Sequence, residues 1–158
     1  MRPEFDIRPM VDKHSAMPIA RLRVLQNFDE VHLSDMRRGI VFVLAAWSGP
    51  AVIGLQRFTR AIQSLDTRSL DLVVLDTDCL NEDSATQLSG GPNFTTGGWG
   101  ETIWIRDGRV FARVLAHSAP ESLMEQHTVQ PSTTMPVRKY RRLYSGCLVS
   151  KASEREMN

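Results

Sequence analysis

The sequence predicts an α/β protein in which helices cover both faces of a mixed central β-sheet. Three observations predict this class. Apolar runs of strand length alternate with segments of helical periodicity. Two of these alternations have the β-α-β order that connects parallel strands of one sheet. Farther along, Asp107-Gly108 separates two strand-like runs as a hairpin turn, which adds antiparallel strands.

The chain has 158 residues, enough for one domain of ordinary size with short extensions. The regular alternation of elements begins near Leu22 and ends near Val129. We therefore expect an N-terminal extension over residues 1–20, a folded domain over residues 21–128 and a basic C-terminal tail over residues 129–158.

The first elements follow from apolar runs and capping residues. Residues 22–25 suggest a short strand, and Asn27 or Asp29 is suited to cap a short helix that ends before Gly39. Residues 40–46 are rich in Val, Ile and Phe. Such a continuous apolar run is typical of a strand that is buried on both faces.

A helix is expected to begin directly after this central strand. Ser48 has the side chain of an N-cap, and Pro50 suits the first turn, where no N–H donor is needed. Apolar residues then recur at spacings of four, three, four and three, which makes one stripe on a helix. They are Ala51, Leu55, Phe58, Ile62 and Leu65.

The remaining elements are predicted by the same rules. They are a buried strand over residues 70–76, a short helix capped by Asn81 or Asp83 through residue 88, strands over residues 101–106 and 109–115, and a last helix that starts near Ser118.

Composition excludes several classes of protein. Cys79 and Cys147 are the two cysteines, and a single distant pair cannot build a cysteine zinc site. We expect neither a metal nor a cofactor. No apolar run approaches the roughly 20 residues that span a bilayer, and the N-terminus lacks the apolar stretch of a secretory signal. The expected location is therefore cytoplasmic, without a membrane partner.

Charge is distributed unevenly although the net charge is only +1. From residue 136 onward there are six basic and two acidic residues, which leaves 13 basic and 16 acidic residues upstream. Basic tails of this kind dock on acidic partners, bind nucleic acid weakly, or are simply solvated. The tail residues concerned are Arg138, Lys139, Arg141 and Arg142.

Several segments, taken together and in order, resemble thioredoxin from about Leu22 to His127. The resemblance covers the start of a first helix, a central strand that ends in a Trp-x-Gly-Pro-x sequence, a third strand that closes on an Asp, and a loop with the hairpin that follows it. These segments are residues 27–31, 40–51, 73–78 and 98–110.

The resemblance implies a thioredoxin fold, but four positions depart from the family's pattern. Ser48-Gly49-Pro50-Ala51 stands in place of Cys-Gly-Pro-Cys, Gly100 in place of the cis-proline, Phe42 in place of the buried acid, and Gln56 in place of the proline in the second helix. Thiol–disulfide exchange needs an attacking thiolate and a second cysteine to resolve the mixed disulfide. We therefore expect a redox-inactive member that is not an enzyme.

The same resemblance implies a binding surface where thioredoxins grip peptides. We expect it to contact another protein or a second copy of the chain, although a terminal extension that covers it is an equal alternative. Exposed tryptophan on an apolar patch is typical of protein interfaces. The expected residues are Trp47, Ser48, Gly49, Pro50, Ala51, Val52, Ile53, Trp99 and Gly100.

The alternative function is an enzyme that uses the same pocket for other chemistry. A nucleophilic Ser48 would need an adjacent base and an orienting group, and no histidine is expected beside it. An acidic cluster near a strand end has the oxygen ligands that Mg²⁺ or Ca²⁺ prefers, but not EF-hand spacing, so capping explains it more simply. That cluster is Asp76, Asp78, Glu82 and Asp83.

Overall fold

The computed structural model describes residues 6–27, 30–89 and 98–129. Within these residues the protein forms a mixed five-stranded sheet with the order β1-β3-β2-β4-β5. Strand β3 pairs in parallel with β1 and β2, whereas β4 pairs antiparallel with β2 and β5. The strands are β1 (Arg23–Leu25), β2 (Arg38–Leu44), β3 (Asp71–Asp76), β4 (Glu101–Arg106) and β5 (Arg109–Leu115).

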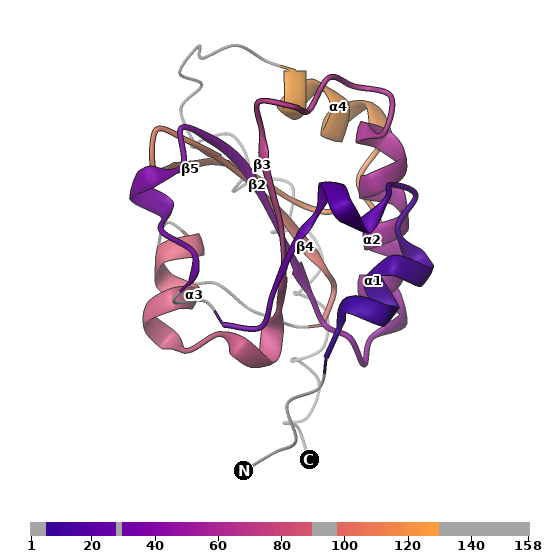
Figure 1. The fold of residues 1–158 in the computed structure, drawn as a ribbon, viewed down its shortest axis with the longest axis horizontal. Coiled ribbons are helices and arrows are strands. Elements are labelled where there is room, and N and C mark those ends of the chain that lie inside the picture. The colour runs from indigo at the N-terminus through magenta and orange to yellow at the C-terminus, as the bar shows by residue number, and fades with distance from the viewer. Residues whose placement is uncertain (1–5, 28–29, 90–97, 130–158) are drawn as a thin grey trace, which may run out of the picture.

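Helices cover both faces of this sheet, so the expected fold class is confirmed. Helices α1, α2 and α4 lie on one face, and α3 lies on the other (Figure 1). The helices are α1 (Arg8–His14), α2 (Gly49–Ile62), α3 (Glu82–Ser89) and α4 (Glu121–Val129). None of the helices in the described ranges is long and apolar enough to cross a membrane.

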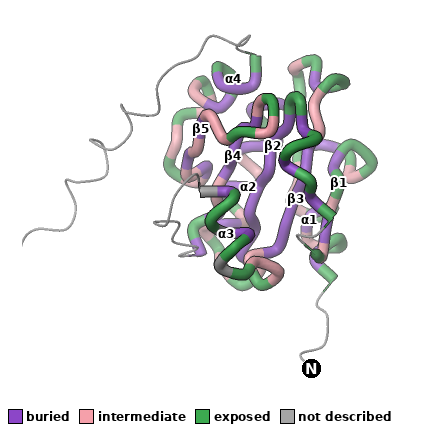
Figure 2. Tube along the Cα trace, turned by 90° about the vertical axis from the view of Figure 1, so that its left-hand side faces the viewer, coloured by how far each residue is buried: buried purple, intermediate pink, exposed green. Residues whose placement is uncertain are grey.

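The central strand β2 is buried on both faces, as its continuous apolar run predicts (Figure 2). Ile40, Phe42 and Leu44 belong to the core beneath α2, whereas Val41 and Val43 belong to the core beneath α3. This alternation follows from the two-residue period of a strand. The sheet thus separates two apolar clusters and holds the end of β2 in a fixed place.

The expected N-terminal extension is wrong for its described part, because residues 6–20 pack into the domain. Ile7 and Val11 are fully buried in the core beneath α2. The backbone N–H of Ala16 donates to Thr59 Oγ1 of α2 at 2.9 Å. Helix α1 is only seven residues long, and such a short helix depends on tertiary contacts for its stability.

The helix expected between Asn27 and Gly39 is also wrong where the segment is described. Among the described residues there, Glu30 and Leu33–Asp35 have 3₁₀ conformation, and none has α-helical conformation. The backbone bonds instead to the β4–β5 turn, since Gly108 N–H donates to Met36 O at 2.9 Å. Tertiary pairing therefore replaces the helical hydrogen bonds that the capping residues suggested.

Two local predictions are confirmed by backbone geometry. Asp107 and Gly108 both have positive φ, 46° and 74°, as a two-residue hairpin turn between right-twisted strands requires. Asn81 caps α3, because its Oδ1 accepts the Ser84 N–H at 2.9 Å. The predictions for the tail, for Cys147 and for Gly90, Gly91 and Gly97 lie outside the described residues.

Candidate functional site

The candidate site lies at the edge of the sheet where the parallel strands end. Residues 47–51 follow β2 and open α2. Strand β4 runs antiparallel to β2, with Glu101 opposite Val43, so residues 98–100 enter the sheet at the same edge. We call this side of the molecule the carboxyl edge.

Two glycines let these segments meet. Gly100 has φ 72°, and a Cβ built there would lie 2.7 Å from Ala51 Cα. Gly98 has φ 74°, and its Cβ would lie 2.5 Å from the Trp47 ring. A side chain at either position would be strained and would clash, so the contact between the two segments depends on glycine.

Ser48 occupies the N-cap position of α2, but its side chain does not cap the helix, which corrects the expected role. Its hydroxyl donates to the carbonyl oxygen of Gly98. The first helical bond is made by the backbone, with Val52 N–H donating to Ser48 O at 3.1 Å. Ser48 thus ties α2 to the loop before β4, and no histidine in the described part of the chain bonds to its hydroxyl.

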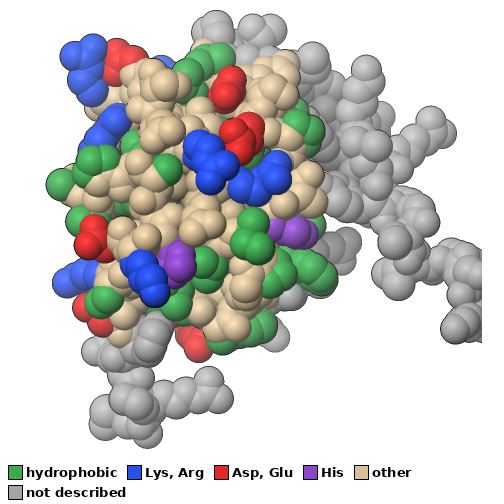
Figure 3. Space-filling model, turned by 90° about the vertical axis from the view of Figure 1, so that its right-hand side faces the viewer, with side chains coloured by type: hydrophobic (Ala, Val, Ile, Leu, Met, Phe, Trp, Pro, Cys, Tyr) green, Lys and Arg blue, Asp and Glu red, His purple; other side chains and the backbone are tan. Residues whose placement is uncertain are grey.

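Three large apolar side chains at this edge face solvent. Trp47 is 69% exposed, Ile53 51% and Trp99 50%. We call these three residues the tryptophan surface. Figure 3 shows hydrophobic side chains gathered toward the lower right of the helical face, beside a histidine.

The rest of the expected binding surface divides by exposure. Ala51 and Gly100 were expected on the surface but are buried beneath it, because each fills the space against the other. The others lie at the surface with intermediate or full exposure: Ser48, Gly49, Pro50 and Val52.

His117 belongs to this site although sequence reasoning missed it. Its ring stacks on Trp99 with centroids 5.2 Å apart. The strand register brings the two rings together, because Glu101 pairs with Leu115 and two further residues along each strand place Trp99 opposite His117. The hairpin turn was the available sequence signal, but counting from it misses this register by one residue, because the register shifts between Trp104 and Ile105.

Glu101 and Arg113 form a second feature that sequence reasoning missed. Arg113 Nε lies 2.8 Å from Glu101 Oε1, and the Glu101 side chain is only 14% exposed. Burial raises the pKa of Glu101 to about 7, although the Arg113 charge opposes that shift. Glu101 directly follows Gly100, so a titratable carboxyl lies at the edge of the site.

An aromatic side chain, that of Phe42, stands at the position where the thioredoxin family has a buried acid. Phe42 is fully buried, and its ring stacks on Phe58 at a centroid distance of 5.7 Å. No proton acceptor is provided by this side chain. Gln56, at the position of the family's helix proline, lies inside the continuous helix α2 and contacts His14 Nδ1 at 3.2 Å.

The acidic cluster is explained by capping where it is described. Asp76 is buried and accepts the Asp78 N–H at 3.0 Å, and burial raises its pKa. Asp78 and Asp83 are exposed. No group of His, Cys, Asp and Glu side chains suited to a metal ion occurs among the residues that were placed. Cys79 is half-buried, and its Sγ contacts the Gln26 carbonyl.

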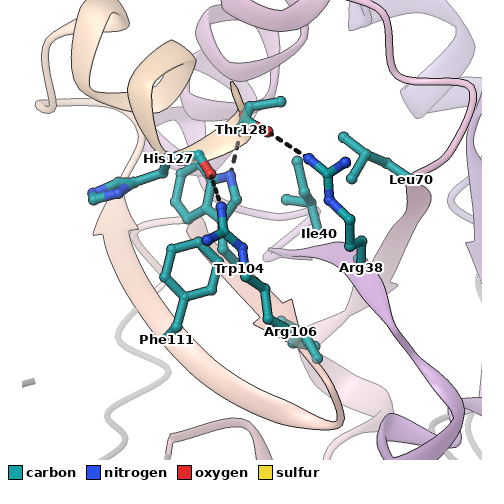
Figure 4. A pocket seen from close by; sticks show the side chains of 10 residues that line it. Arg38, Ile40, Leu70, Trp104, Arg106, Phe111, His127 and Thr128 are labelled. Atoms are coloured by element: carbon teal, nitrogen blue, oxygen red, sulfur yellow. Dashed lines mark hydrogen bonds between the residues drawn. The ribbon is translucent and has the colours of Figure 1, made fainter. Parts of the chain in front are cut away.

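A small hollow at the opposite edge of the sheet has a structural role. Arg38 donates to Thr128 O at 3.3 Å, and Arg106 donates to His127 O at 3.5 Å (Figure 4). The Arg106 guanidinium also lies 4.1 Å from the centre of the Phe111 ring. Both arginines thus hold the last carbonyls of α4, and the space left is about that of one water molecule.

Comparison with known proteins shows what this architecture is. No protein-family model and no curated protein sequence matches the chain. Among solved structures, oxidized mitochondrial thioredoxin 3 from Saccharomyces cerevisiae is similar with a TM-score of 0.51 and 16% identity, over 69% of this chain and 94% of that one. The chain has the thioredoxin fold. A chain from a structure on thiol resolution in yeast mitochondrial 1-Cys peroxiredoxin by the glutathione and thioredoxin systems agrees, with a TM-score of 0.51, 18% identity and coverage of 68% and 92%.

The thioredoxin fold gives the carboxyl edge its arrangement but does not settle its chemistry. At the helix start this chain has the hydroxyl of Ser48 and the methyl group of Ala51. The Ser48 hydroxyl is bonded to a backbone carbonyl, and the Ala51 methyl group is buried. Around them lie the exposed Trp47, Ile53 and Trp99.

Proposed function

We propose that this thioredoxin-fold protein is a non-catalytic interaction or assembly module that binds another protein through the tryptophan surface, the basic tail, or both. The observation that carries the proposal is the exposure of Trp47, Ile53 and Trp99 at one edge of the sheet. Exposed apolar side chains cost free energy in water, and tryptophan is the residue most enriched among binding hot spots.

The absence of thiol chemistry is part of the same proposal. Ser48 and Ala51 supply no thiolate, and Phe42 supplies no proton acceptor at the helix start. A cytoplasmic location is also part of the proposal, as expected from the composition of the sequence.

Affinity capture from the native cells, quantified by mass spectrometry, tests the binding role. Trp47→Ala and Trp99→Ala should each reduce recovery of the partner about 10-fold or more, as expected when a hot-spot residue is truncated. Val129→Ala is the matched control, because Val129 is an equally exposed apolar residue at the end of α4. Unchanged recovery with both tryptophan variants and with a chain ending at Val129 would refute the proposal.

A disulfide-reduction assay tests the proposed absence of thiol chemistry. With a dithiol reductant and a disulfide substrate, the wild-type protein should give no turnover above the uncatalysed rate. Robust turnover would show that the chain is an oxidoreductase and would overturn the proposed class of function.

A further inference from the structure

The carboxyl edge carries acidic side chains as well as the tryptophan surface. Leu44 at the end of β2 pairs with Asp76 at the end of β3, so the segments that follow these strands are neighbours. Asp78 and Asp83, both exposed, therefore lie on the β3 side of the edge that carries Trp47. A segment that fits this edge would combine apolar rings with positive charge.

The chain's own tail has that composition. It contains aromatic and aliphatic residues at short intervals, namely Val137, Tyr140, Tyr144 and Leu148. Four basic residues stand among them: Arg138, Lys139, Arg141 and Arg142. The body of the chain carries more acidic than basic residues, whereas the tail carries six basic and two acidic ones. Body and tail are thus complementary in charge.

The tail also starts at a suitable distance. Helix α4 ends at Val129 beside Arg38, at the first residue of β2, so the tail must pass the length of that strand to reach the tryptophan surface. Seven strand residues span about 23 Å. Residues 130–136 also number seven and span up to about 24 Å when extended. Residue 137 onward can therefore reach the carboxyl edge.

We propose that residues 137–148 of the same chain dock on the tryptophan surface, with tyrosine rings against Trp47 and Trp99 and basic side chains toward Asp78 and Asp83. The proposal rests on the proposed function, because it concerns the same surface. A tethered segment has an effective concentration in the millimolar range, so weak contacts are enough to keep it bound.

A nitroxide on Cys147 tests this in the full chain. Cys79→Ser leaves Cys147 as the only thiol, and ¹⁵N spectra report the indole N–H of each tryptophan. The label should remove most of the intensity of the Trp47 and Trp99 signals but spare that of Trp104. Trp104 is the internal control, because it is buried and its Nε1 donates to Thr128 Oγ1 in α4.

Two further comparisons show whether the same chain or a second copy occupies the tryptophan surface, and whether the acidic side chains contribute to docking. Labelled ¹⁴N chain mixed with unlabelled ¹⁵N chain should leave all three signals intact; attenuation in that mixture would assign the surface to a second copy and overturn the proposal. Asp78→Asn with Asp83→Asn should restore the Trp47 and Trp99 intensities. Asp66→Asn should not, because Asp66 lies before β3, at the other end of that strand.

A measurement that needs no spin label tests the same proposal if the Cys79→Ser variant does not fold. Tyr140→Ser with Tyr144→Ser in the otherwise unchanged chain should shift the Trp47 and Trp99 indole signals and leave Trp104 in place. Unshifted signals, or unattenuated ones in the labelled chain, would overturn tail docking. They would not affect the proposed function, which is tested separately by partner recovery with Trp47→Ala, Trp99→Ala and the chain ending at Val129.

Discussion

At the scale of the residue, the site depends on two glycines, which have no side chain to separate the segments that meet there. Gly98 and Gly100 have no Cβ, so the loop before β4 can lie against Trp47 and Ala51. The Ser48 hydroxyl is bonded to the Gly98 carbonyl and thereby fixes the same approach. These small residues leave the indole rings exposed, and they also determine where the rings lie.

Gly100→Ala should destabilise the fold by about 2–4 kcal/mol, from a non-glycine residue at positive φ together with a clash against backbone. Its φ is 72° and the nearest atom is Ala51 Cα. Gly49→Ala is the control and should change stability by less than about 0.5 kcal/mol, because nothing lies within 4 Å of a Cβ there. Urea unfolding measures both, and equal effects would contradict the role assigned to Gly100.

Glu101 should make stability fall as the pH rises. Its pKa is about 7 in the fold against an ordinary 4.5, so between these values the folded protein keeps a proton that the unfolded chain has released. The stabilisation by this proton is fully present below pH 4.5 and is lost as the pH rises to about 7. The free energy of unfolding should fall by no more than about 1.4 kcal/mol for each pH unit in this range. Glu101→Gln should remove this slope in urea unfolding measured across that range.

His127 supplies the control of opposite sign. Burial, followed by the Arg106 charge, lowers the pKa of its imidazole below the usual 6.5, so its contribution is present above pH 6.5 and is lost as the pH falls. His127→Gln should therefore make the decline of stability with rising pH steeper, not flatter. Identical slopes in the Glu101→Gln variant and the wild type would refute the proton assigned to Glu101.

At the scale of the element, α1 is a short helix without a clear apolar pattern in its sequence, and it nevertheless packs into the core. Its seven residues include one fully buried side chain, Val11, with Ile7 directly before the helix. The helix adds a third member to the layer formed by α2 and α4 (Figure 1). Its contacts with α2 also support the helix whose N-terminus carries the candidate site.

Ile7→Ala should cost about 2–5 kcal/mol, the usual range for removing a buried aliphatic side chain. Lys13→Ala, on the exposed side of the same helix, should stay within about 0.5 kcal/mol. Thermal or urea unfolding separates the two outcomes. A neutral Ile7→Ala would mean that residues 6–20 are an extension after all.

At the scale of the whole molecule, the two edges of the sheet differ in character. The carboxyl edge combines exposed rings with Asp78 and Asp83, whereas at the opposite edge Arg38 and Arg106 hold the end of α4. The thioredoxin fold keeps these edges apart by the length of β2. The proposed binding surface and the anchoring of α4 are therefore separated in space.

Restoring both cysteines should not restore an efficient reductase. In Ser48→Cys with Ala51→Cys, the two thiols would stand at the start of α2, but Phe42 and Phe58 would still fill the space beneath them with carbon. Turnover in a disulfide-reduction assay should remain far below that of an ordinary thioredoxin assayed alongside. Comparable turnover would show that the two cysteines alone are what this chain lacks.

The sequence by itself determined the local elements. Residues 40–46 and 70–76 were recognisable because a strand buried on both faces needs a continuous apolar run. Asp107-Gly108 and the Asn81 cap were recognisable because backbone geometry there selects particular residue types. The arrangement of residues 47–51 after the central strand also indicated where a site would lie.

Tertiary structure alone decided the contacts between distant segments. The stacking of His117 on Trp99 and the pairing of Arg113 with Glu101 depend on strand register, which no local pattern specifies. The Ser48 hydroxyl turned from a capping role to the Gly98 carbonyl because the loop before β4 lies within reach. Such choices are made by packing across long separations in sequence, where a neighbour in space offers a better partner than a neighbour in the chain.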